Sequence, residues 1–591
     1  MITYNEFLVL RCFIEDGTLT QRQIVQKIKL SLGTVSQTIK NLREKGYVEK
    51  NELTESGINV MKAYRVKNAV ILAAGMATRF APISYEFPKG LTVVTGEVLI
   101  ERQIRQLKEK GVEQIVVVVG HMLEKFLYLK DKWDVEIVVN NDYKRRNTHS
   151  SVYAAREFLS NTYICCADNY YPENLFHFYE YHSFYCAQFL QGESKTERAL
   201  ITDRHDLIIA TQKPCKDAWT MQGHAYFASD FSKRFKTILE EYYNKPGVEG
   251  LYWEGIYAEN LDTLPMYMVK CEDDDILEFD SVEDLRKFEP DFFIHNDLKV
   301  VKNICSVLKG EPQDIKNIYP VKGGLTNSAF KFDFKGKTYI YRNPGINTIG
   351  YIDREREHFA MLSAKKLGID KSYLYDDAKS GWKLSYFVNT TEEFSFKNKK
   401  HLDKLCAHMR TLHESKITCG KKFDYFEQAD IMLDRLKTID IVAVEDALGI
   451  RESVGLINLK IKQDNWQVTL CHNDIYSPNL LLSGEELCLI DWEYAGDSDI
   501  GNDLCKLFAA EDLPLDAIDD VLSVYYKRKP TKAEKRHILG CAAVNYYYWY
   551  IWSLYYIRTG LDCASWQMLW YKKMKKYADE FCKLDKEEEK D

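Results

Sequence analysis

The sequence has no hydrophobic run long enough to span a bilayer and no pair of cysteines in C-x-x-C spacing. The most apolar long segment, residues 546–557, is about a dozen residues rich in Tyr and Trp, whereas a membrane helix needs about 20. Residues 1–6 lack the basic and apolar regions of a signal peptide. The 15 cysteines are scattered, which indicates reduced thiols. We therefore expect a cytoplasmic protein without membrane insertion.

Positively charged residues are in the minority. The chain has 80 Lys and Arg against 88 Asp and Glu, which gives a formal net charge of -8 at pH 7. An acidic chain does not bind nucleic acid over its whole surface, so any DNA contact must be local. What the chain does have is length, since its 591 residues far exceed a single core. One domain per about 100 to 200 residues predicts three or four domains.

Residues 1–65 form the first predicted segment. Apolar residues at helical spacing run from Phe7 to Ile14, a second helix begins after Thr20, and a third is predicted over residues 32–42. The pattern resembles a winged helix-turn-helix, an α+β fold whose third helix enters a DNA major groove. Winged helices also contact proteins, so DNA and protein contact both stay open. In either case we expect the segment to be dispensable for chemistry.

The second segment, residues 67–290, begins with a buried strand that runs into a loop containing Gly75. Because small residues at a strand end let backbone N–H groups approach a triphosphate, Gly75 is a candidate nucleotide contact. Arg79 and Lys89 supply positive charge, and we predict that they neutralise phosphates. Further strands alternate with helices, and Asp168 ends one of them at the edge where ligands of a doubly wound sheet collect.

This order, L-A-A-G, then Arg, then P-K, resembles the nucleotidyltransferases that activate sugar phosphates and phosphocholine, whose fold is α/β with a Rossmann-like mixed sheet. Three further motifs narrow the resemblance to bacterial CTP:phosphocholine cytidylyltransferases: residues 87–91, 99–104 and 278–281. The resemblance implies that CTP is a substrate and that Asp168 and a second carboxylate hold Mg²⁺. For the second carboxylate we expect Asp280, with Glu278 as the alternative.

The same resemblance implies nucleotide contact at Ser150, in a polar stretch before a helix. One departure is Ala77, which stands where the family has glycine and would stiffen or displace the loop. Trp253 is a candidate wall for a trimethylammonium group, which aromatic faces attract by about 1 to 2 kcal/mol each. Three other aromatic residues share this candidacy: Trp219, Tyr226 and Tyr257. For any single one of the four, a place in the core is the reading we favour.

The third segment contains H-N-D-I-Y-S-P-N at 472–479 and I-D-W-E at 490–493. In kinase-type sites an Asp takes the proton of the attacking hydroxyl, an Asn five residues later reaches a Mg²⁺, and a second Asp at a strand end completes the metal cage. Asp474, Asn479 and Asp491 fill these positions. The spacing therefore predicts phosphoryl transfer, with Asp474 as general base and the other two as metal ligands.

Residues upstream of this motif are predicted to contact ATP. Arg342 ends a strand where kinases place a phosphate-binding Lys, and Asn327 follows a glycine turn that would cover phosphates. A guanidinium can bridge a phosphate and a carboxylate. We expect Glu355 on the next helix to be the partner of Arg342, with Glu357 as runner-up because helix register is uncertain by about two positions. Residues 383–388 would form the adenine-binding hinge.

Residues 298–585 resemble the choline/ethanolamine kinase family, which has a protein-kinase-like α+β fold. Three stretches carry the resemblance: residues 471–474, 490–494 and 499–502. It implies that ATP and choline are substrates. Trp549 and Trp552 lie three apart and share a helix face, as a cage for a quaternary ammonium requires. Tyr494, which precedes a loop shorter than in animal choline kinases, is expected to line the same site.

Together the two resemblances imply a bifunctional enzyme. ATP phosphorylates choline, and CTP then converts phosphocholine to CDP-choline with release of pyrophosphate. Two alternatives stay open. The folds could belong to a sugar-1-phosphate nucleotidyltransferase joined to a sugar or aminoglycoside-like kinase, since fold does not fix substrate. The chain could also be a transcription regulator whose degenerate enzyme domains sense choline. The presence of Asp474, Lys89 and Asp168 argues against such a loss of catalytic activity.

Overall fold

The computed structural model describes residues 2–50, 52–321, 327–345, 348, 350–561 and 563–588. The chain divides into two compact units, Met1–Val301 and Lys302–Asp591. The first unit therefore holds both the first and the second predicted segment, and the second unit holds the third. Across the described ranges, no helix combines the length and the apolar character needed to cross a membrane.

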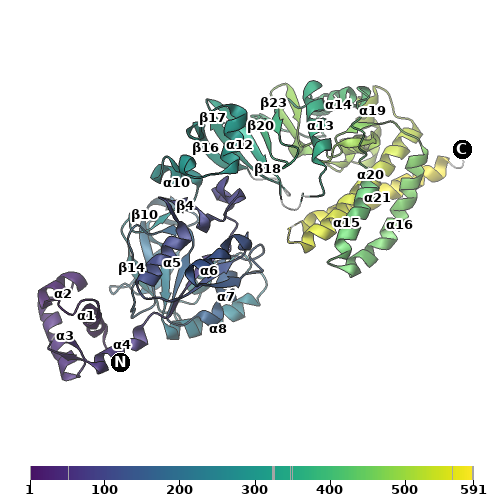
Figure 1. The fold of residues 1–591 in the computed structure, drawn as a ribbon. Helices are drawn as coiled ribbons and strands as arrows, with labels where there is room; N and C mark the ends of the chain where they lie inside the picture. The colour runs from purple at the N-terminus through teal and green to yellow at the C-terminus, as the bar shows by residue number, and fades with distance from the viewer. Residues whose placement is uncertain are drawn as a thin grey trace. The chain divides into compact units, whose positions relative to one another are not determined.

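The predicted winged helix-turn-helix is confirmed. Thr3 and Thr20 each form a capping box with the residue three positions later, which satisfies backbone N–H groups at the start of the first two helices. The elements are α1 (Tyr4–Glu15), α2 (Gln21–Ile28), α3 (Leu32–Glu44), β1 (Val48–Glu49), β2 (Glu52–Leu53) and α4 (Glu55–Met61). They are drawn in purple in Figure 1.

Helix α1 packs directly against the second segment. The rings of Tyr4 and Phe7 lie 5.4 and 5.3 Å from the ring of Tyr181, whose hydroxyl donates to the carbonyl of Ile2 at 2.7 Å. The core of the winged helix continues into Tyr179, which is also buried. Removal of residues 1–65 would therefore expose apolar surface on the second segment. The segment that we expect to be dispensable for chemistry is thus packed against the second segment.

A mixed sheet forms the centre of the first unit. Within the described residues it has nine strands, in the order β12-β11-β13-β8-β3-β6-β7, with β10 paired to β13 and β14. Strands β8, β3, β6 and β7 are parallel neighbours, and β13 runs antiparallel to β8. The bounds are β3 (Asn68–Ala73), β6 (Gln114–Val119), β7 (Glu136–Val139), β8 (Thr162–Cys166), β10 (Phe184–Ser194), β11 (Ala199–Thr202), β12 (Ile208–Gln212), β13 (Cys215–Phe227) and β14 (Tyr267–Lys270).

Helices cover both faces of this sheet, because its central parallel strands are apolar on both sides (Figure 1). Ile104 of α5 packs on one face. Val152 of α7 and Phe235 of α8 pack on the other. The remaining elements that position the site are α5 (Leu99–Glu109), α7 (Thr148–Ala154), β9 (Asn169–Tyr170), α8 (Ser229–Tyr243), α9 (Trp253–Ala258), β15 (Leu277–Glu278) and α10 (Val282–Phe288). The predicted α/β fold with a mixed sheet is confirmed.

The second unit starts within α12 (Lys299–Leu308), continues with an antiparallel sheet in the order β16-β17-β18-β20-β19 and ends in a mainly helical part. The strands are β16 (Ile315–Val321), β17 (Ser328–Phe334), β18 (Lys337–Asn343), β19 (Tyr373–Asp376) and β20 (Lys383–Tyr386), and α13 (Arg354–Lys366) lies between β18 and β19 in sequence. This sheet followed by helices is the protein-kinase-like α+β fold that the sequence predicts.

Two short strand pairs carry the loops of the kinase motif. They are β22 (Val468–Cys471) with β25 (Gly496–Asp499), and β23 (Leu480–Ser483) with β24 (Glu486–Leu489). The helices around them are α14 (Lys399–Glu414), α15 (Tyr425–Lys437), α16 (Ile441–Gln463), α17 (Gly501–Leu504), α18 (Lys506–Ala509), α19 (Ile518–Tyr526), α20 (Lys532–Arg558) and α21 (Ala564–Glu588). A single hydrophobic core joins these helices to the strand pairs.

Candidate functional site

The loop of residues 472–479 is held by the carboxylate of Asp503. This carboxylate accepts hydrogen bonds from the backbone N–H groups of His472 at 2.9 Å and Asn473 at 2.7 Å, and it lies 3.2 Å from Nε2 of His413. Although burial opposes ionisation, His413 holds the pKa of Asp503 below its usual range. The loop is thus fixed through its backbone, which leaves the side chain of Asp474 to face the pocket.

Asp474 has the setting of a general base. Asn479 Nδ2 donates to the backbone carbonyl of Asp474 at 3.0 Å and to its carboxylate at 3.3 Å. Burial raises the pKa of Asp474 to about 7, and the ammonium of Lys506 limits the rise. A carboxylate whose pKa lies near the working pH can take a proton from a hydroxyl. The structure therefore brings Asp474 and Asn479 together as the sequence spacing predicts.

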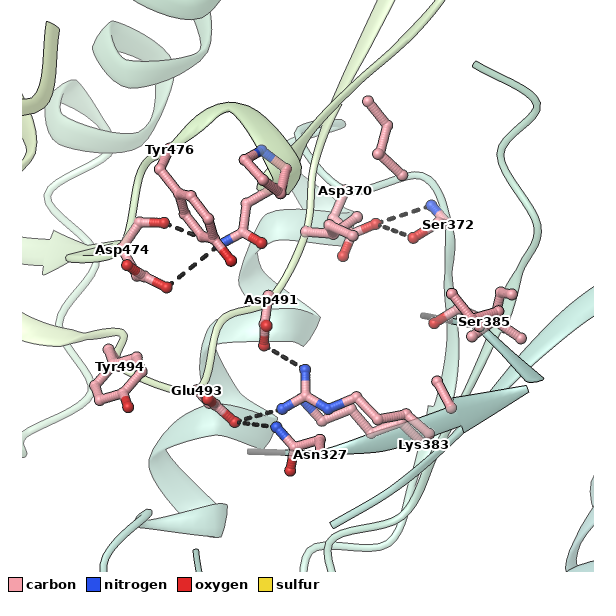
Figure 2. A pocket seen from close by; sticks show the side chains of 18 of the residues that line it. Asn327, Asp370, Ser372, Lys383, Ser385, Asp474, Tyr476, Asp491, Glu493 and Tyr494 are labelled. Atoms are coloured by element: carbon pink, nitrogen blue, oxygen red, sulfur yellow. Dashed lines mark hydrogen bonds and ion pairs between the residues drawn. The ribbon is translucent and has the colours of Figure 1, made fainter. Parts of the chain in front are cut away.

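Arg342 connects the sheet to the second aspartate of the motif. Its guanidinium pairs with the carboxylates of Asp491 and Glu493, and Asn327 Nδ2 donates to Glu493 at 2.9 Å (Figure 2). Although burial opposes ionisation, the charge of Arg342 lowers the pKa of Asp491. Arg342, Asn327 and Asp491 thus meet as expected. Glu493, to which the sequence analysis assigned no role, completes the group.

The helix partner of Arg342 is Glu357 and not Glu355. Glu357, 2% exposed, lies 3.7 Å from Arg342 and also pairs with Lys383 of β20. Glu355, 79% exposed, pairs instead with Lys421 at 2.8 Å. The expected pair of Arg342 and Glu355 is therefore wrong, because α13 turns the later glutamate inward. Lys383 was expected only in the hinge, yet a Lys within a short apolar strand was a signal for a buried ion pair.

The carboxylates of this group suit a divalent cation. Oxygen atoms of Glu357, Asp491 and Glu493 lie within 4.8 Å of one another. Mg²⁺ prefers oxygen ligands, and it is usually held by one or two carboxylates together with substrate phosphates. Asp491 and the amide oxygen of Asn479 fit this chemistry.

Asp491 and Asn479 line one pocket of about 640 Å³. Residues 385–388, at the end of β20 and just after it, line the pocket where the hinge was predicted. Figure 2 shows Asp474 and Ser385 on opposite sides of Asp491. Aromatic side chains also line the pocket: Tyr494, Tyr546, Trp549, Trp552, Trp566 and Trp570. The same cavity thus holds charged groups, a base and an aromatic wall.

The aromatic wall is formed by α20 and α21 together. The rings of Trp549 and Trp552 lie 5.8 Å apart, and those of Tyr494 and Trp570 lie 5.4 and 5.7 Å from Trp549. Trp549 is half-buried, whereas Trp552 is 1% exposed and also belongs to the core. The sequence analysis missed Trp570 and Trp566, although their spacing of four on a helix was a signal that they share a face.

A second charged cluster lies in the first unit, where β3 and β8 end. Lys89 Nζ lies 2.9 Å from Asp168 Oδ2, and Arg79 lies 3.0 Å from Asp280. Strand β15 pairs with β9, which follows Asp168, so Glu278 comes to the same cluster. The structure thus gathers Lys89, Asp168, Arg79 and Asp280 in one cluster, as the resemblance to nucleotidyltransferases implies.

Three carboxylates dominate the electrostatics of this cluster. Desolvation, reinforced by the charge of Asp168, raises the pKa of Glu278 to about 7. Although desolvation opposes it, the charges of Asp168, Glu278 and Asp280 raise the pKa of Lys89. An oxygen-only donor set with excess negative charge suits Mg²⁺. The sequence analysis preferred Asp280 to Glu278, and the structure brings both carboxylates to Lys89.

The loop after β3 is open and strained. A Cβ added at Gly75 would meet no atom within 4 Å, so the loop leaves room for a ligand. Ala77 has φ 45° and ψ 47°, a left-handed conformation that costs an L-residue other than glycine about 1 kcal/mol or more. The residue that replaces a family glycine therefore retains a backbone conformation that favours glycine.

Two predicted contacts lie elsewhere. Ser150 is buried; its hydroxyl donates to the carbonyl of Asn147 at 2.8 Å and accepts a hydrogen bond from Asn140 at 2.9 Å, so the fold already uses it. Trp253 is 2% exposed and packs against the ring of Phe227 at 5.3 Å. Ser150 as a nucleotide contact stays a prediction, and the burial of Trp253 favours its place in the core over the substrate wall. Tyr226 and Tyr257 are also buried, whereas Trp219 is half-buried.

Comparison with known proteins assigns a family to each part of the chain. The family profile for winged helix-turn-helix DNA-binding matches residues 2–49. The MobA-like NTP transferase domain matches residues 69–174. The choline/ethanolamine kinase family matches residues 318–536. These three matches follow the order of the predicted segments.

Individual relatives are similar to separate parts of the chain. A choline-phosphate cytidylyltransferase of Streptococcus pneumoniae is 33% identical over 37% of this chain and 96% of the relative. A 2-aminoethylphosphonate cytidylyltransferase of Lancefieldella rimae is also 33% identical, over 38% of this chain and 92% of the relative. The crystal structure of a choline kinase from Streptococcus pneumoniae is 24% identical, with a TM-score of 0.41, over 48% of this chain and 98% of that one.

Proposed function

We propose, from the premise that this chain belongs to the choline-phosphate cytidylyltransferase family and carries a choline/ethanolamine kinase segment, that it makes CDP-choline in two steps. The second unit transfers the γ-phosphoryl group of ATP to choline. The first unit transfers CMP from CTP to phosphocholine and releases pyrophosphate. The observation that carries the proposal is the coexistence of a base-containing pocket with an aromatic wall and a separate cluster of carboxylates and cations on the other unit.

In the kinase step, Asp474 would take the proton of the choline hydroxyl as that oxygen attacks phosphorus. Asn479 and Asp491 would hold Mg²⁺, which when bound neutralises charge on the ATP phosphates. Arg342 already neutralises Asp491 and Glu493, and it would contact phosphate from this position. Trp549, Trp552 and Tyr494 would surround the trimethylammonium group, which attracts aromatic faces and donates no hydrogen bond.

In the cytidylyl step, Arg79 and Lys89 would neutralise the CTP phosphates next to the open loop at Gly75. Asp168 and Asp280 would hold Mg²⁺, and Glu278 is close enough to share that role. Arg79 and Lys89 are each paired with a carboxylate. If CTP and Mg²⁺ bind together, the phosphates would pair with the two cationic side chains and Mg²⁺ with the carboxylates, so that no charge is left unpaired.

A second candidate substrate for the first unit follows from the relative that acts on 2-aminoethylphosphonate, whose identity to this chain is equally high. A phosphonate already carries its phosphorus group and needs no kinase. The kinase segment on the same chain favours a phosphate ester that is made from an alcohol, and so favours phosphocholine.

The test is an incubation of the full chain with choline, ATP, CTP and Mg²⁺, followed by mass detection of CDP-choline. Omission of CTP should stop the reaction at phosphocholine, and supplied phosphocholine should remove the need for ATP. Ethanolamine and 2-aminoethylphosphonate serve as matched substrates. Failure to form CDP-choline from supplied phosphocholine, with formation of the phosphonate product, would replace the proposed substrate of the first unit.

We also propose that the winged helix contacts DNA through α3, whose Ser36, Gln37 and Lys40 are exposed. A shift assay should give binding that weakens steeply with salt, since phosphate contacts release counterions. Binding that does not depend on salt would instead favour a protein partner. A cytoplasmic location is part of the proposal, and the absence of disulfide bonds among the cysteines that the structure describes supports it.

A further inference from the structure

Lys506 is a buried lysine in the kinase pocket whose only effect described above is to limit the rise in the pKa of Asp474. It begins α18, is 4% exposed and lines the same cavity as Asp474. Its Nζ lies 5.1 Å from the centre of the Tyr546 ring and 5.8 Å from that of Trp549. The ammonium is therefore directed to the part of the cavity where the aromatic wall meets the base.

The other cations of the pocket already have partners. Arg342 pairs with Asp491 and Glu493, and Lys383 pairs with Glu357. Lys573 donates to the carbonyls of Ala509 at 2.8 Å and Ala510 at 3.1 Å, which satisfies its ammonium. Lys506 differs from all three. Among the residues that the structure describes, none accepts a hydrogen bond from its Nζ or forms an ion pair with it.

A buried ammonium without an acceptor is unfavourable, and aromatic rings offset only part of the lost hydration. Desolvation lowers the pKa of Lys506, while the charge of Asp474 acts in the opposite direction. An anion that enters the pocket would remove this cost. The proposed substrate, choline, is itself a cation. Lys506 places a second positive charge beside the aromatic wall, and the two charges repel each other unless negative charge lies between them.

We propose that Lys506 binds the phosphoryl group as it moves from ATP to the substrate oxygen, and then the phosphate of the product. This assignment rests on the kinase function proposed above. In that step the bond from phosphorus to the leaving oxygen of ADP breaks, a bond to the substrate oxygen forms, and the hydroxyl proton passes to Asp474. Negative charge on the transferred group then lies near both Lys506 and the substrate ammonium, where it offsets the repulsion between them.

The test compares Lys506→Met with Lys506→Arg in the full chain. Lys506→Met should lower kcat for choline phosphorylation by about 100-fold or more and weaken binding of phosphocholine by at least about 10-fold. Lys506→Arg, which keeps the charge, should recover part of both. The matched control is Lys576→Met on α21, because Lys576 bonds to Asp512 at 2.7 Å and does not line the pocket. Its kcat and phosphocholine affinity should stay at wild-type values.

A pH profile separates this role from an effect on Asp474 alone. If Lys506→Met only moved the midpoint of the profile upward, with the plateau rate and phosphocholine affinity unchanged, the proposal would be overturned. Should wild type not phosphorylate choline, the kinase function fails, but titration with inorganic phosphate still tests Lys506. Equal phosphate affinity in wild type and Lys506→Met would then refute it. Lys506→Gln, checked by circular dichroism, replaces the Met variant if that variant does not fold.

Discussion

The two charged clusters contain ion pairs that differ in solvent exposure. In the first unit, Arg79 and Asp280 are 74% and 55% exposed. In the second, Arg342 and Glu357 are 16% and 2% exposed. An exposed pair contributes about 0 to 1 kcal/mol, whereas loss of one partner of a buried pair costs about 3 to 5 kcal/mol. The pair of Arg79 and Asp280 can therefore be exchanged for ligand at little cost, whereas Lys89 and Asp168, 11% and 28% exposed, resemble the pairs of the second unit and are also part of the folded framework.

The largest expected effect tests whether the two sites are independent. Asp474→Ala should lower choline phosphorylation by about 1,000-fold or more, because the base is lost, and should leave cytidylyl transfer from supplied phosphocholine unchanged. Lys89→Ala should do the reverse. Both rates are measured on each variant by mass detection of product. Loss of both activities in either folded variant would show that the sites are not separate.

Stability should show the contrast between buried and exposed pairs. Arg342→Ala should lower the free energy of unfolding of the second unit by about 3 to 5 kcal/mol, since Glu493 and Glu357 lose a buried partner. Arg79→Ala should lower that of the first unit by less than about 1 kcal/mol. Urea unfolding with probes for each unit measures both values. Equal effects would mean that burial does not distinguish the clusters.

The pH dependence of the kinase step should follow Asp474. Its pKa is raised to about 7, and it acts as a base only when deprotonated. The value of kcat/KM should therefore fall about tenfold per pH unit below 7 and level off above it. The measurement is choline phosphorylation between pH 5.5 and 9, with circular dichroism at each end. A rate that stays flat through pH 6 would contradict the assignment of the base.

The aromatic wall should affect the substrate more than the nucleotide. Trp549→Ala is expected to raise the KM for choline about 10-fold, equivalent to about 1.4 kcal/mol, with a smaller change for ATP. Trp570→Ala should act in the same direction, because its ring lies 5.7 Å from Trp549. Trp253→Ala is the control from the other unit, where the side chain is core and its loss should reduce stability. An unchanged KM for choline in both pocket variants would show that Trp549 and Trp570 only pack in the core.

The smallest effect concerns strain in the first unit. Ala77→Gly should raise the stability of that unit by up to about 1 kcal/mol, because glycine adopts the observed left-handed backbone without a Cβ clash. Ala74→Gly, at a buried neighbouring position with no positive φ, should lower stability instead. Thermal unfolding of both variants gives the comparison. The same sign for both would show that the conformation of Ala77 is not strained.

Motifs read from local spacing predicted much of this protein. The interval between Asp474 and Asn479, the strand before Gly75 and the capped helices of residues 1–65 each depend on neighbours within a few positions. Hydrogen bonds in loops and caps act over that range, so the sequence shows them directly. The alternation of strands and helices indicated the α/β fold, and the α+β folds were implied by the resemblance of these motifs to known families.

Contacts between distant elements were decided only by tertiary packing. Whether Glu355 or Glu357 meets Arg342 depends on how α13 turns against the sheet, and a shift of two positions moves a side chain from solvent to the interior. The same reason explains why Trp253 is core and why Trp570 joins Trp549 across two helices. Burial depends on how the helices and sheets pack together. The spacing of residues along the chain therefore indicated which residue types take part in the chemistry, whereas tertiary packing determined which of them lie in the same site.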